Sequence, residues 1–333
     1  MSVTSILSRI FGRRAVASAA LAPPASPSKT TEPRLSFGAA GDRFVRIASL
    51  DFFGPYRRSP NGAWLIAWRD GNDAGTHGGH RASGPGRFYL YHGEALVAQG
   101  RAERPNDGLV ANDGSFIIND WGFNSGLSGT FRAYRSDGSL ILERAFAANL
   151  VNNGLADDGR FAACQAANAP HSTDSSILAV FDLRSGTEIA SWVPESGWAD
   201  SYSFPPGDVA IGLHDRDGVC YNYTLGGEFI DRAKWIDQQA RSGNAYALDH
   251  ILRDMDGPVS GDVAATMIAG LETALANPDF DERQRALALK VRGRCLEAQG
   301  DLAAALASYD DAIALDPKIG LKRRVAQLRR ELS

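Results

Sequence analysis

The chain has 333 residues, of which 22% are charged, and its formal net charge at pH 7 is −4. This length allows two domains with separate cores, and the slightly acidic balance argues against nucleic acid as a partner. No apolar run approaches the roughly 20 residues that a transmembrane helix needs. The cysteines are too few and too scattered for a disulfide framework or a zinc site, so we expect buried free thiols.

Residues 1–40 are predicted to form an N-terminal tail and linker. The segment SILSRIFGRR places its apolar side chains on one helical face, and the stretch after it is rich in alanine and proline, as in flexible tethers. A cytoplasmic protein is the expectation. Residues 1–34 leave two alternatives open. The apolar helical face would suit a helix on a membrane surface. Arg13 and Arg14 precede an alanine-rich run, which would suit an export signal.

Residues 41–235 contain a pattern that recurs about every 45 residues. Each unit has two pairs of short, alternating apolar runs, and each pair is joined by a tight turn at glycine, as in a β-hairpin. The pattern predicts units of four short antiparallel strands. The turn glycines are Gly62, Gly114, Gly159 and Gly207 in the first hairpins, and Gly93, Gly138, Gly186 and Gly227 in the second.

Four-stranded units with this period resemble the blades of a β-propeller of the WD40-like or quinoprotein-like type. The resemblance covers about residues 43–235 and depends on the turns SPNG, ANDG and ADDG. No Trp-Asp dipeptide closes a unit, so the chain is not an orthodox WD40 protein. About four blades are expected, and an extra strand at residues 44–50 is one way to close the ring. A four-bladed ring without it, a partial ring, a half-ring completed by a second copy, and a single β-sandwich are the alternatives.

Residues 236–333 change to a helical periodicity, with helices expected at 262–276, 282–299, after Asp301, and at 318–332. Residues 286–317 resemble a tetratricopeptide (TPR) repeat. Gly293 occupies the small-residue position where two helices cross, Gly300 ends the first helix, Asp301 caps the second, and Pro317 opens the next. The predicted fold class is therefore a multidomain β + α protein, with an antiparallel propeller-like domain followed by TPR-like α-helical hairpins.

The TPR resemblance also implies a binding groove, because the first helix of each repeat in that family lines a groove that receives a peptide. By position, Lys290, Arg294 and Glu297 would face this groove, with Arg324 from the next helix. Residues 282–333 carry more Lys and Arg than Asp and Glu, so an acidic peptide or a terminal carboxylate is the expected ligand. A solvated basic face is the alternative.

The loops between the second and third strands of the units are expected to share one face of the propeller. Trp121 and Phe123 in the second loop are candidates for an apolar anchor of a partner protein, or for a plug of the central channel. His77, His80 and His171 are weak candidates for metal ligands. The sequence contains no nucleophile elbow and no phosphate-binding glycine loop.

These patterns predict a non-catalytic interaction or scaffold protein without a cofactor, whose loop face and helical groove bind partner proteins or acidic peptides. A propeller that binds a metal or a small molecule, with hydrolase activity, is one alternative. The other is an exported or surface-associated protein tethered by residues 1–34. The sequence identifies neither the partner nor the oligomeric state.

Overall fold

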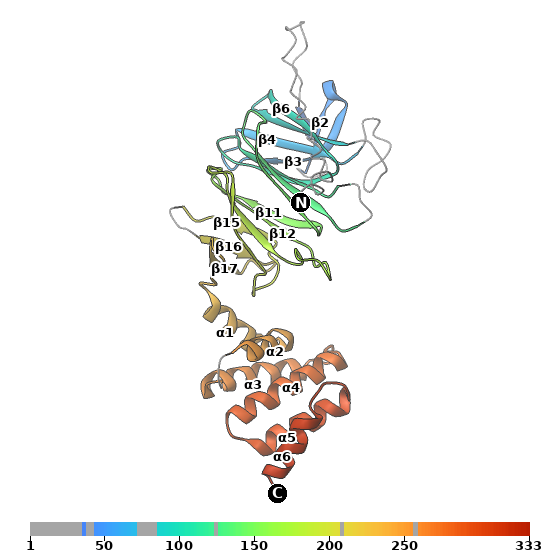
Figure 1. Cartoon of the computed structure of the whole chain (residues 1–333), viewed down its shortest axis with the longest axis vertical. Coiled ribbons are helices and arrows are strands. Elements are labelled where there is room, and N and C mark those ends of the chain that lie inside the picture. Colours follow the sequence, from blue (N-terminus) through green and yellow to red (C-terminus); the bar gives the residue numbers. More distant parts are fainter. Residues whose placement is uncertain (1–34, 38–42, 72–84, 123–125, 207–209, 256–258) are drawn as a thin grey trace, which may run out of the picture.

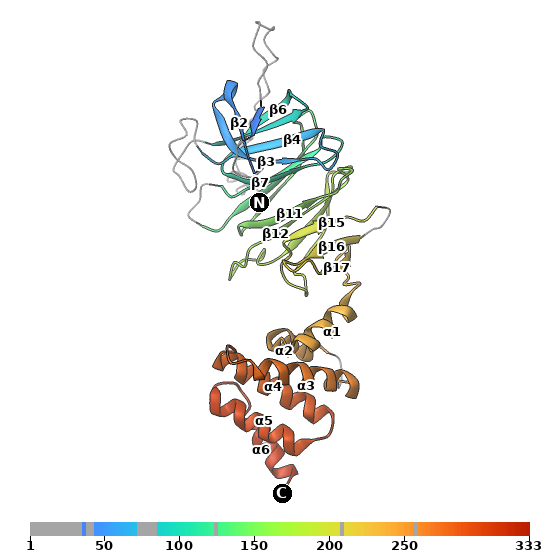
Figure 2. The ribbon, with the colours of Figure 1, turned by 180° about the vertical axis from the view of Figure 1, so that it is seen from behind.

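The computed structural model describes residues 35–37, 43–71, 85–122, 126–206, 210–255 and 259–333. In these ranges, four antiparallel sheets precede six α-helices. Figures 1 and 2 show an elongated molecule with the sheets at one end and the helices at the other. The chain is thus a multidomain β + α protein. None of the helices in the described part combines the length and the hydrophobicity needed to cross a membrane.

The strands pair in chain order within each sheet. The first sheet has β1 (Leu35–Phe37), β2 (Phe44–Ile47), β3 (Phe52–Arg58), β4 (Trp64–Arg69), β5 (Gly86–His92) and β6 (Ala95–Ala102). The second has β7 (Pro105–Val110), β8 (Phe116–Asp120), β9 (Gly129–Tyr134) and β10 (Leu140–Phe146). The third has β11 (Leu150–Leu155), β12 (Phe161–Ala166), β13 (Leu178–Asp182) and β14 (Thr187–Trp192). The fourth has β15 (Ser201–Ser203), β16 (Ala210–His214) and β17 (Cys220–Thr224).

Glycine turns join the strands of these sheets. All predicted turn glycines within the described residues have a positive φ, which glycine adopts without the steric cost that a side chain brings: Gly62, Gly93, Gly114, Gly138, Gly159, Gly186 and Gly227. Gly207 lies outside the described residues. The turn chemistry that defined the repeat in the sequence is therefore present in the backbone.

The sheets pack face to face in chain order. Phe88 and Phe116 lie in the core between the first and second sheets, with ring centroids 5.6 Å apart. Phe131 and Phe181 stack at 4.7 Å between the second and third sheets. The first strands of the later sheets link the series, since β7 contacts β3 and β4 of the first sheet as well as β11, and β11 contacts β15. The strands thus form four sheets in series rather than the two sheets of a sandwich.

The predicted ring-closing strand belongs to the first sheet instead. β2 pairs with β3, and its Val45 and Ile47 are buried in the same core cluster as Tyr89 and Tyr91 of β5. The hairpin of β2 and β3 therefore covers the outer apolar face of the first sheet, which lies opposite the face that packs on the second sheet. Within the described residues, the first and fourth sheets make no extensive contact with each other. The expectation that residues 44–50 close a ring is wrong, because their apolar side chains are buried locally.

The fourth sheet also departs from the predicted four-strand unit. After Gly227, the chain forms an isolated bridge between Phe229 and Tyr223 and a few backbone hydrogen bonds to β17, but no strand. Asp231 Oδ2 then accepts hydrogen bonds from the backbone N and the side-chain Nδ2 of Asn222, at 2.9 and 2.8 Å. Since α1 begins at the next residue, the chain leaves the sheet before a fourth strand forms. The run expected to form that strand is therefore the start of the helical part.

The helices are α1 (Arg232–Ser242), α2 (Ala245–Asp254), α3 (Gly261–Ala276), α4 (Glu282–Ala298), α5 (Leu302–Leu315) and α6 (Lys322–Glu331). A single core cluster runs from the third and fourth sheets through α1 to α4. Trp235 of α1 lies in this cluster, with its ring centroid 5.9 Å from that of Phe229. The sheets and the helices are therefore joined by shared hydrophobic packing.

The helical pair α4–α5 has the contacts that the sequence indicated. A side chain at Gly293 would overlap the ring of Tyr309, so the two helices approach closely there. Asp301 caps α5 by accepting a hydrogen bond from Ala304 N at 3.0 Å. The expectation for Pro317 is wrong, because α6 begins only at Lys322. Asp316 Oδ1 accepts a hydrogen bond from Lys318 N at 2.8 Å, which forms a turn in place of the helix start.

Candidate functional site

One end of the sheets carries most of the candidate residues. Because neighbouring strands are antiparallel, the loops after β4, β8, β12 and β16 and the links between successive sheets emerge at the same end. We call this surface the loop end. Its described residues are 70–71, 85, 103–104, 121–122, 126–128, 147–149, 167–177, 193–200 and 215–219.

Hydrogen bonds between neighbouring connections organise the loop end. Ser128 N donates to Asn149 Oδ1 at 3.2 Å, and Ala167 N donates to Asn149 O at 2.7 Å. Ala199 N donates to the buried Gln165 Oε1 at 3.2 Å. These bonds connect the ends of the second, third and fourth sheets side by side, so the described loop end of these three sheets is one continuous surface.

Trp121, a predicted anchor residue, lies at this surface in a half-buried position. Its Nε1 donates to Leu150 O at 2.6 Å, which ties the loop after β8 to the third sheet. The Arg104 guanidinium lies 5.1 Å from the centroid of the Trp121 ring. Its predicted companion Phe123 lies outside the described residues. Trp121 therefore supports the loop end and exposes only part of its side chain there.

Three large apolar side chains in the described part of the loop end are more than half exposed and escaped the sequence analysis: Leu127, Val193 and Trp198. Leu127, in the loop after β8, is 53% exposed, and Trp198, in the link between the third and fourth sheets, is 51% exposed. The backbone beside Trp198 is held firmly, because Ala199 N bonds to Gln165 and Asp200 N donates to His214 O at 2.7 Å. A tryptophan in the polar, glycine-containing segment PESGWADS was the signal in the sequence.

The histidine candidates do not form a metal centre within the described residues. His77 and His80 lie outside these ranges. His171 has a left-handed backbone, with φ of 75°, in the loop after β12. His214 Nε2 lies 2.8 Å from Ser203 Oγ on the fourth sheet. Across the part of the chain that the structure describes, no three His, Cys, Asp or Glu side chains are grouped to hold a metal ion.

Two of the predicted groove residues meet at one buried carboxylate. Lys290 Nζ lies 3.0 Å from Asp249 Oδ1, and Arg294 Nη1 lies 3.7 Å from the same oxygen. Asp249 belongs to α2 and is only 8% exposed. Arg253 Nε lies 3.4 Å from its other oxygen. Arg294 Nη2 also donates to Leu252 O at 2.7 Å, near the negative end of the α2 dipole.

The other two groove candidates form an ion pair between α4 and α6. Arg324 Nε donates to Glu297 Oε2 at 2.9 Å. The buried Tyr309 lies close by. The pKa of the Tyr309 hydroxyl is raised, mainly by burial and secondly by the Glu297 carboxylate. The four candidates thus have partners within the helical part, and their contact with a peptide stays a prediction.

The cysteines are poor nucleophiles. Cys164 and Cys295 are buried, as expected, whereas Cys220 is only partly buried. Burial raises the pKa of all three thiols, to about 11 for Cys295. Since the thiolate is the reactive form, these cysteines are protonated and unreactive near neutral pH.

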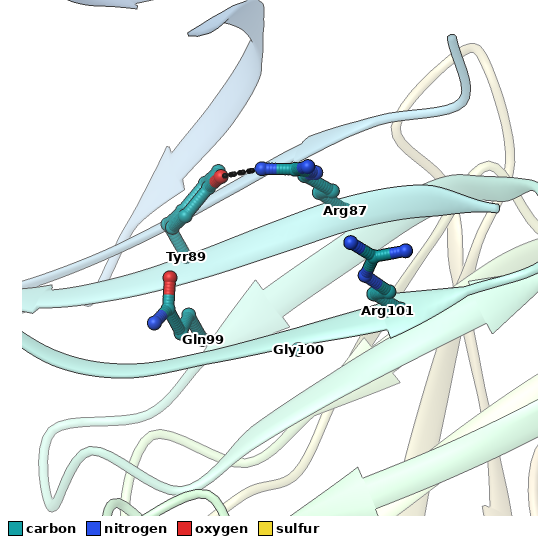
Figure 3. A pocket seen from close by; sticks show the side chains of 5 residues that line it. All are labelled: Arg87, Tyr89, Gln99, Gly100 and Arg101. Atoms are coloured by element: carbon teal, nitrogen blue, oxygen red, sulfur yellow. Dashed lines mark hydrogen bonds between the residues drawn. The ribbon is translucent and has the colours of Figure 1, made fainter. Parts of the chain in front are cut away.

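A cavity of about 330 Å³ lies on the first sheet, and its described lining residues are Arg87, Tyr89, Gln99, Gly100 and Arg101 (Figure 3). Phe88 and Leu90 of β5 pack toward the second sheet, so Arg87 and Tyr89 lie on the opposite, outer face. A second cavity, of about 440 Å³, lies between the turn after β11 and the segment after β15, and its lining includes Asp157, Arg160, Phe161 and Phe204.

No model of a protein family and no curated protein matches the chain. Among solved structures, the C-terminal WD40 domain of Sif2 is similar at 10% identity over 56% of this chain and 43% of that chain, with a TM-score of 0.29. BamB from Moraxella catarrhalis has 14% identity over 52% and 47%, with a TM-score of 0.33. The computationally designed Ika4 protein has 10% identity over 49% and 86%, with a TM-score of 0.32. The chain thus spans less than half the length of the first two, and such low TM-scores establish neither its fold nor its function.

Proposed function

We propose that the protein is a non-catalytic interaction protein that holds a partner protein at the loop end of its sheets. The observation that supports this most is the exposure of Leu127 and Trp198 on this continuous surface. Exposed tryptophan is enriched among the residues that dominate binding energy at protein interfaces. The net charge of −4 favours a protein over nucleic acid as the partner.

The anchoring of the surface supports the same proposal. Binding loses affinity when flexible loops must be ordered, so exposed side chains on a fixed backbone are better suited to it. The hydrogen bonds from Ala199 N to Gln165 and from Trp121 Nε1 to Leu150 O hold the two relevant connections before any partner arrives. The loop end therefore has the features of a preorganised docking face.

The finer architecture belongs to this proposal as well. We take residues 41–235 as a propeller-like domain of four blades that forms a partial ring, and residues 236–333 as TPR-like hairpins. Face-to-face packing of the sheets and the contacts of β7 with β3 and β11, and of β11 with β15, support the blades. The contact between Gly293 and Tyr309 supports the TPR-like crossing.

A second partner surface is proposed on α2 and α4. Three cations, Arg253, Lys290 and Arg294, surround the single carboxylate of Asp249. One carboxylate does not neutralise three positive charges, so an excess of positive charge remains there. This excess favours an acidic peptide as the ligand, as the TPR resemblance implies.

Affinity capture from a lysate of the source cells tests the loop end. The double variant Leu127→Ser/Trp198→Ala should weaken the affinity for the partner by at least about 30-fold. This is the effect of losing a hot spot that contributes about 2 kcal/mol. Leu140→Ser is the matched control, because Leu140 is 49% exposed at the opposite end of the second sheet. Arg253→Gln/Lys290→Gln reports on the helical surface in the same experiment.

The capture experiment has a clear negative outcome. If the loop-end variant and Leu140→Ser retain the same partners as the wild type, the loop end is not the docking face. Loss only in Arg253→Gln/Lys290→Gln would move the interaction to the helices. Thermal unfolding of each variant shows whether the protein is still folded, since surface substitutions usually change stability by no more than about 0.5 kcal/mol.

A further inference from the structure

Two buried asparagines between the second and third sheets have side-chain atoms without a hydrogen-bond partner. Asn119 of β8 is 0% exposed, and within the described residues neither its Oδ1 nor its Nδ2 makes a hydrogen bond. Asn153 of β11 is 8% exposed, and its Oδ1 has no partner among those residues either. Buried polar atoms in proteins are nearly always paired with the protein, with water or with an ion. These amides therefore have unused capacity to bind a ligand.

Both asparagines project into the same space as Asp107 of β7. Asp107 is directly opposite Asn119 in the strand pairing, and directly opposed side chains lie on the same face of a sheet. Leu109 and Ile117, two residues further along each strand, pack in the core between the second and third sheets. From the facing third sheet, Asn153 Nδ2 donates to Asp107 Oδ2 at 3.1 Å. The two sheets thus bring one carboxylate and two amides together.

The other directly opposed neighbours of the asparagines offer little hydrogen bonding. Phe131 of β9 is opposite Asn119, and Cys164 of β12 is opposite Asn153. Both side chains are buried in the core between the two sheets. The phenyl ring has no polar atom, and a thiol is only a weak donor. The amide oxygens are therefore not occupied by the strands beside them.

The Asp107 carboxylate has no positively charged side chain at ion-pair distance within the described residues. It accepts hydrogen bonds from Gly108 N at 2.9 Å and from Asn153 Nδ2 at 3.1 Å, which are both neutral donors. The exposed Arg57 of β3 acts on it only from a longer distance. Carboxylates withdrawn from water are normally paired with a positive charge or coordinate a metal ion. Because Asp107 is half-buried, an ion can reach it from solvent.

Oxygen ligands of this kind match a hard cation. Proteins bind Ca²⁺ through carboxylate and amide oxygens, in flexible coordination that water can complete. Mg²⁺ is a poorer match, because it requires shorter distances and nearly ideal octahedral geometry. The set contains a single charged ligand, and Ca²⁺ affinity depends on the number of charged ligands. A site of this composition is expected at the weak end of the range, with a Kd of about 0.1–1 mM.

We propose that Asp107, Asn119 and Asn153 bind a calcium ion between the second and third sheets, with Asp107 as the charged ligand and the two amide oxygens as neutral ligands. Since the oxygens come from both sheets, the bound ion links the sheets and raises the temperature at which they unfold. The site lies between two sheets and does not depend on partner binding at the loop end.

Calorimetric titration of the chelator-treated full chain with CaCl₂ and MgCl₂ tests the site. Saturable binding of Ca²⁺ is expected, with Mg²⁺ at least about tenfold weaker. Asp107→Asn removes the charge but keeps the shape, so it should weaken Ca²⁺ binding about tenfold or more. Asn119→Asp adds a second carboxylate and should tighten binding about tenfold, which a purely structural asparagine would not do. Asp137→Asn is the matched control, because Asp137 is exposed in a turn of the same second sheet.

The proposal is overturned if the wild type shows no saturable Ca²⁺ binding below about 10 mM, since water alone then satisfies the asparagines. Equal weakening by Asp107→Asn and Asp137→Asn, or equally tight binding of Mg²⁺, would also overturn it. Asn153→Asp has the same expected gain and replaces Asn119→Asp if circular dichroism shows that the latter does not fold. An unchanged Kd in the folded variant contradicts the assigned ligands.

Discussion

Replacing Asp120 by alanine is expected to destabilise the sheets strongly. Asp120 ends β8 and is 1% exposed. Its carboxylate accepts hydrogen bonds from the backbone N atoms of Glu103, Arg104 and Gly122, at 2.9, 2.6 and 3.1 Å. It also accepts one from Arg132 Nη1 at 2.6 Å. One buried carboxylate thus holds together the link from the first sheet, the end of β8, and β9.

The contacts allow an estimate of the loss. Removing one partner of a buried ion pair costs about 3–5 kcal/mol, and each buried donor left without an acceptor costs about 1–3 kcal/mol. Arg132 keeps Glu143, at 2.6 Å, as a second partner, and such contributions are not additive. We therefore expect a loss of about 4 kcal/mol for Asp120→Ala. Asp120→Asn keeps one acceptor oxygen and should lose about 2 kcal/mol.

Urea unfolding followed by tryptophan fluorescence measures this loss. Trp64 and Trp68 lie in or beside the core between the first and second sheets, so they report on the affected region. If the urea profile contains more than one transition, each transition is fitted separately. Asp137→Ala is the control, because this exposed turn carboxylate accepts a hydrogen bond from Ser139 N at 2.8 Å, and its removal should cost about 1 kcal/mol at most. A loss for Asp120→Ala no larger than that of the control would refute the reasoning.

Two further substitutions test the packing and a buried acid. Gly293→Ala places a methyl group against the Tyr309 ring and should destabilise the helical part by about 1–3 kcal/mol, measured by circular dichroism; an unchanged transition would contradict the close crossing. Burial raises the pKa of Asp107, which outweighs the lowering by Gly108 N, Arg57 and Asn153. The folded state therefore holds this proton more tightly than the unfolded state, so the contribution of Asp107 to stability falls as pH rises from its unfolded pKa through its raised folded pKa. Asp107→Asn should gain stability relative to the wild type as the pH rises above the ordinary aspartate pKa of about 4; a pH-independent difference in unfolding free energy would contradict this.

Features that depend on neighbours along the chain were predictable from the sequence. A tight turn requires a residue that tolerates positive φ, so turn glycines such as Gly62 and Gly138 indicated where strands end. The cap at Asp301 and the small residue at Gly293 act through contacts within one helical hairpin, and the structure has both. The start of α6 was misjudged, because Pro317 is compatible with a turn as well as with a helix.

Contacts between distant segments required the tertiary structure. The TPR resemblance marked Lys290 and Arg294 as groove residues by their position, yet their shared carboxylate, Asp249, lies on α2. The row of Arg69, Arg87 and Arg101 across the first sheet depends on strand register, which alternating polarity alone does not specify.

The sequence by itself thus determined the repeated strand pairs, their glycine turns and the change to helices, because each of these follows from local backbone preferences and periodicity. Only the tertiary structure decided how the series of sheets ends. An apolar sheet face must be covered, but burial is non-directional, so a further sheet, a hairpin or a helix satisfies it equally well. Here β2 covers the first sheet, and α1 joins the fourth sheet to the helices.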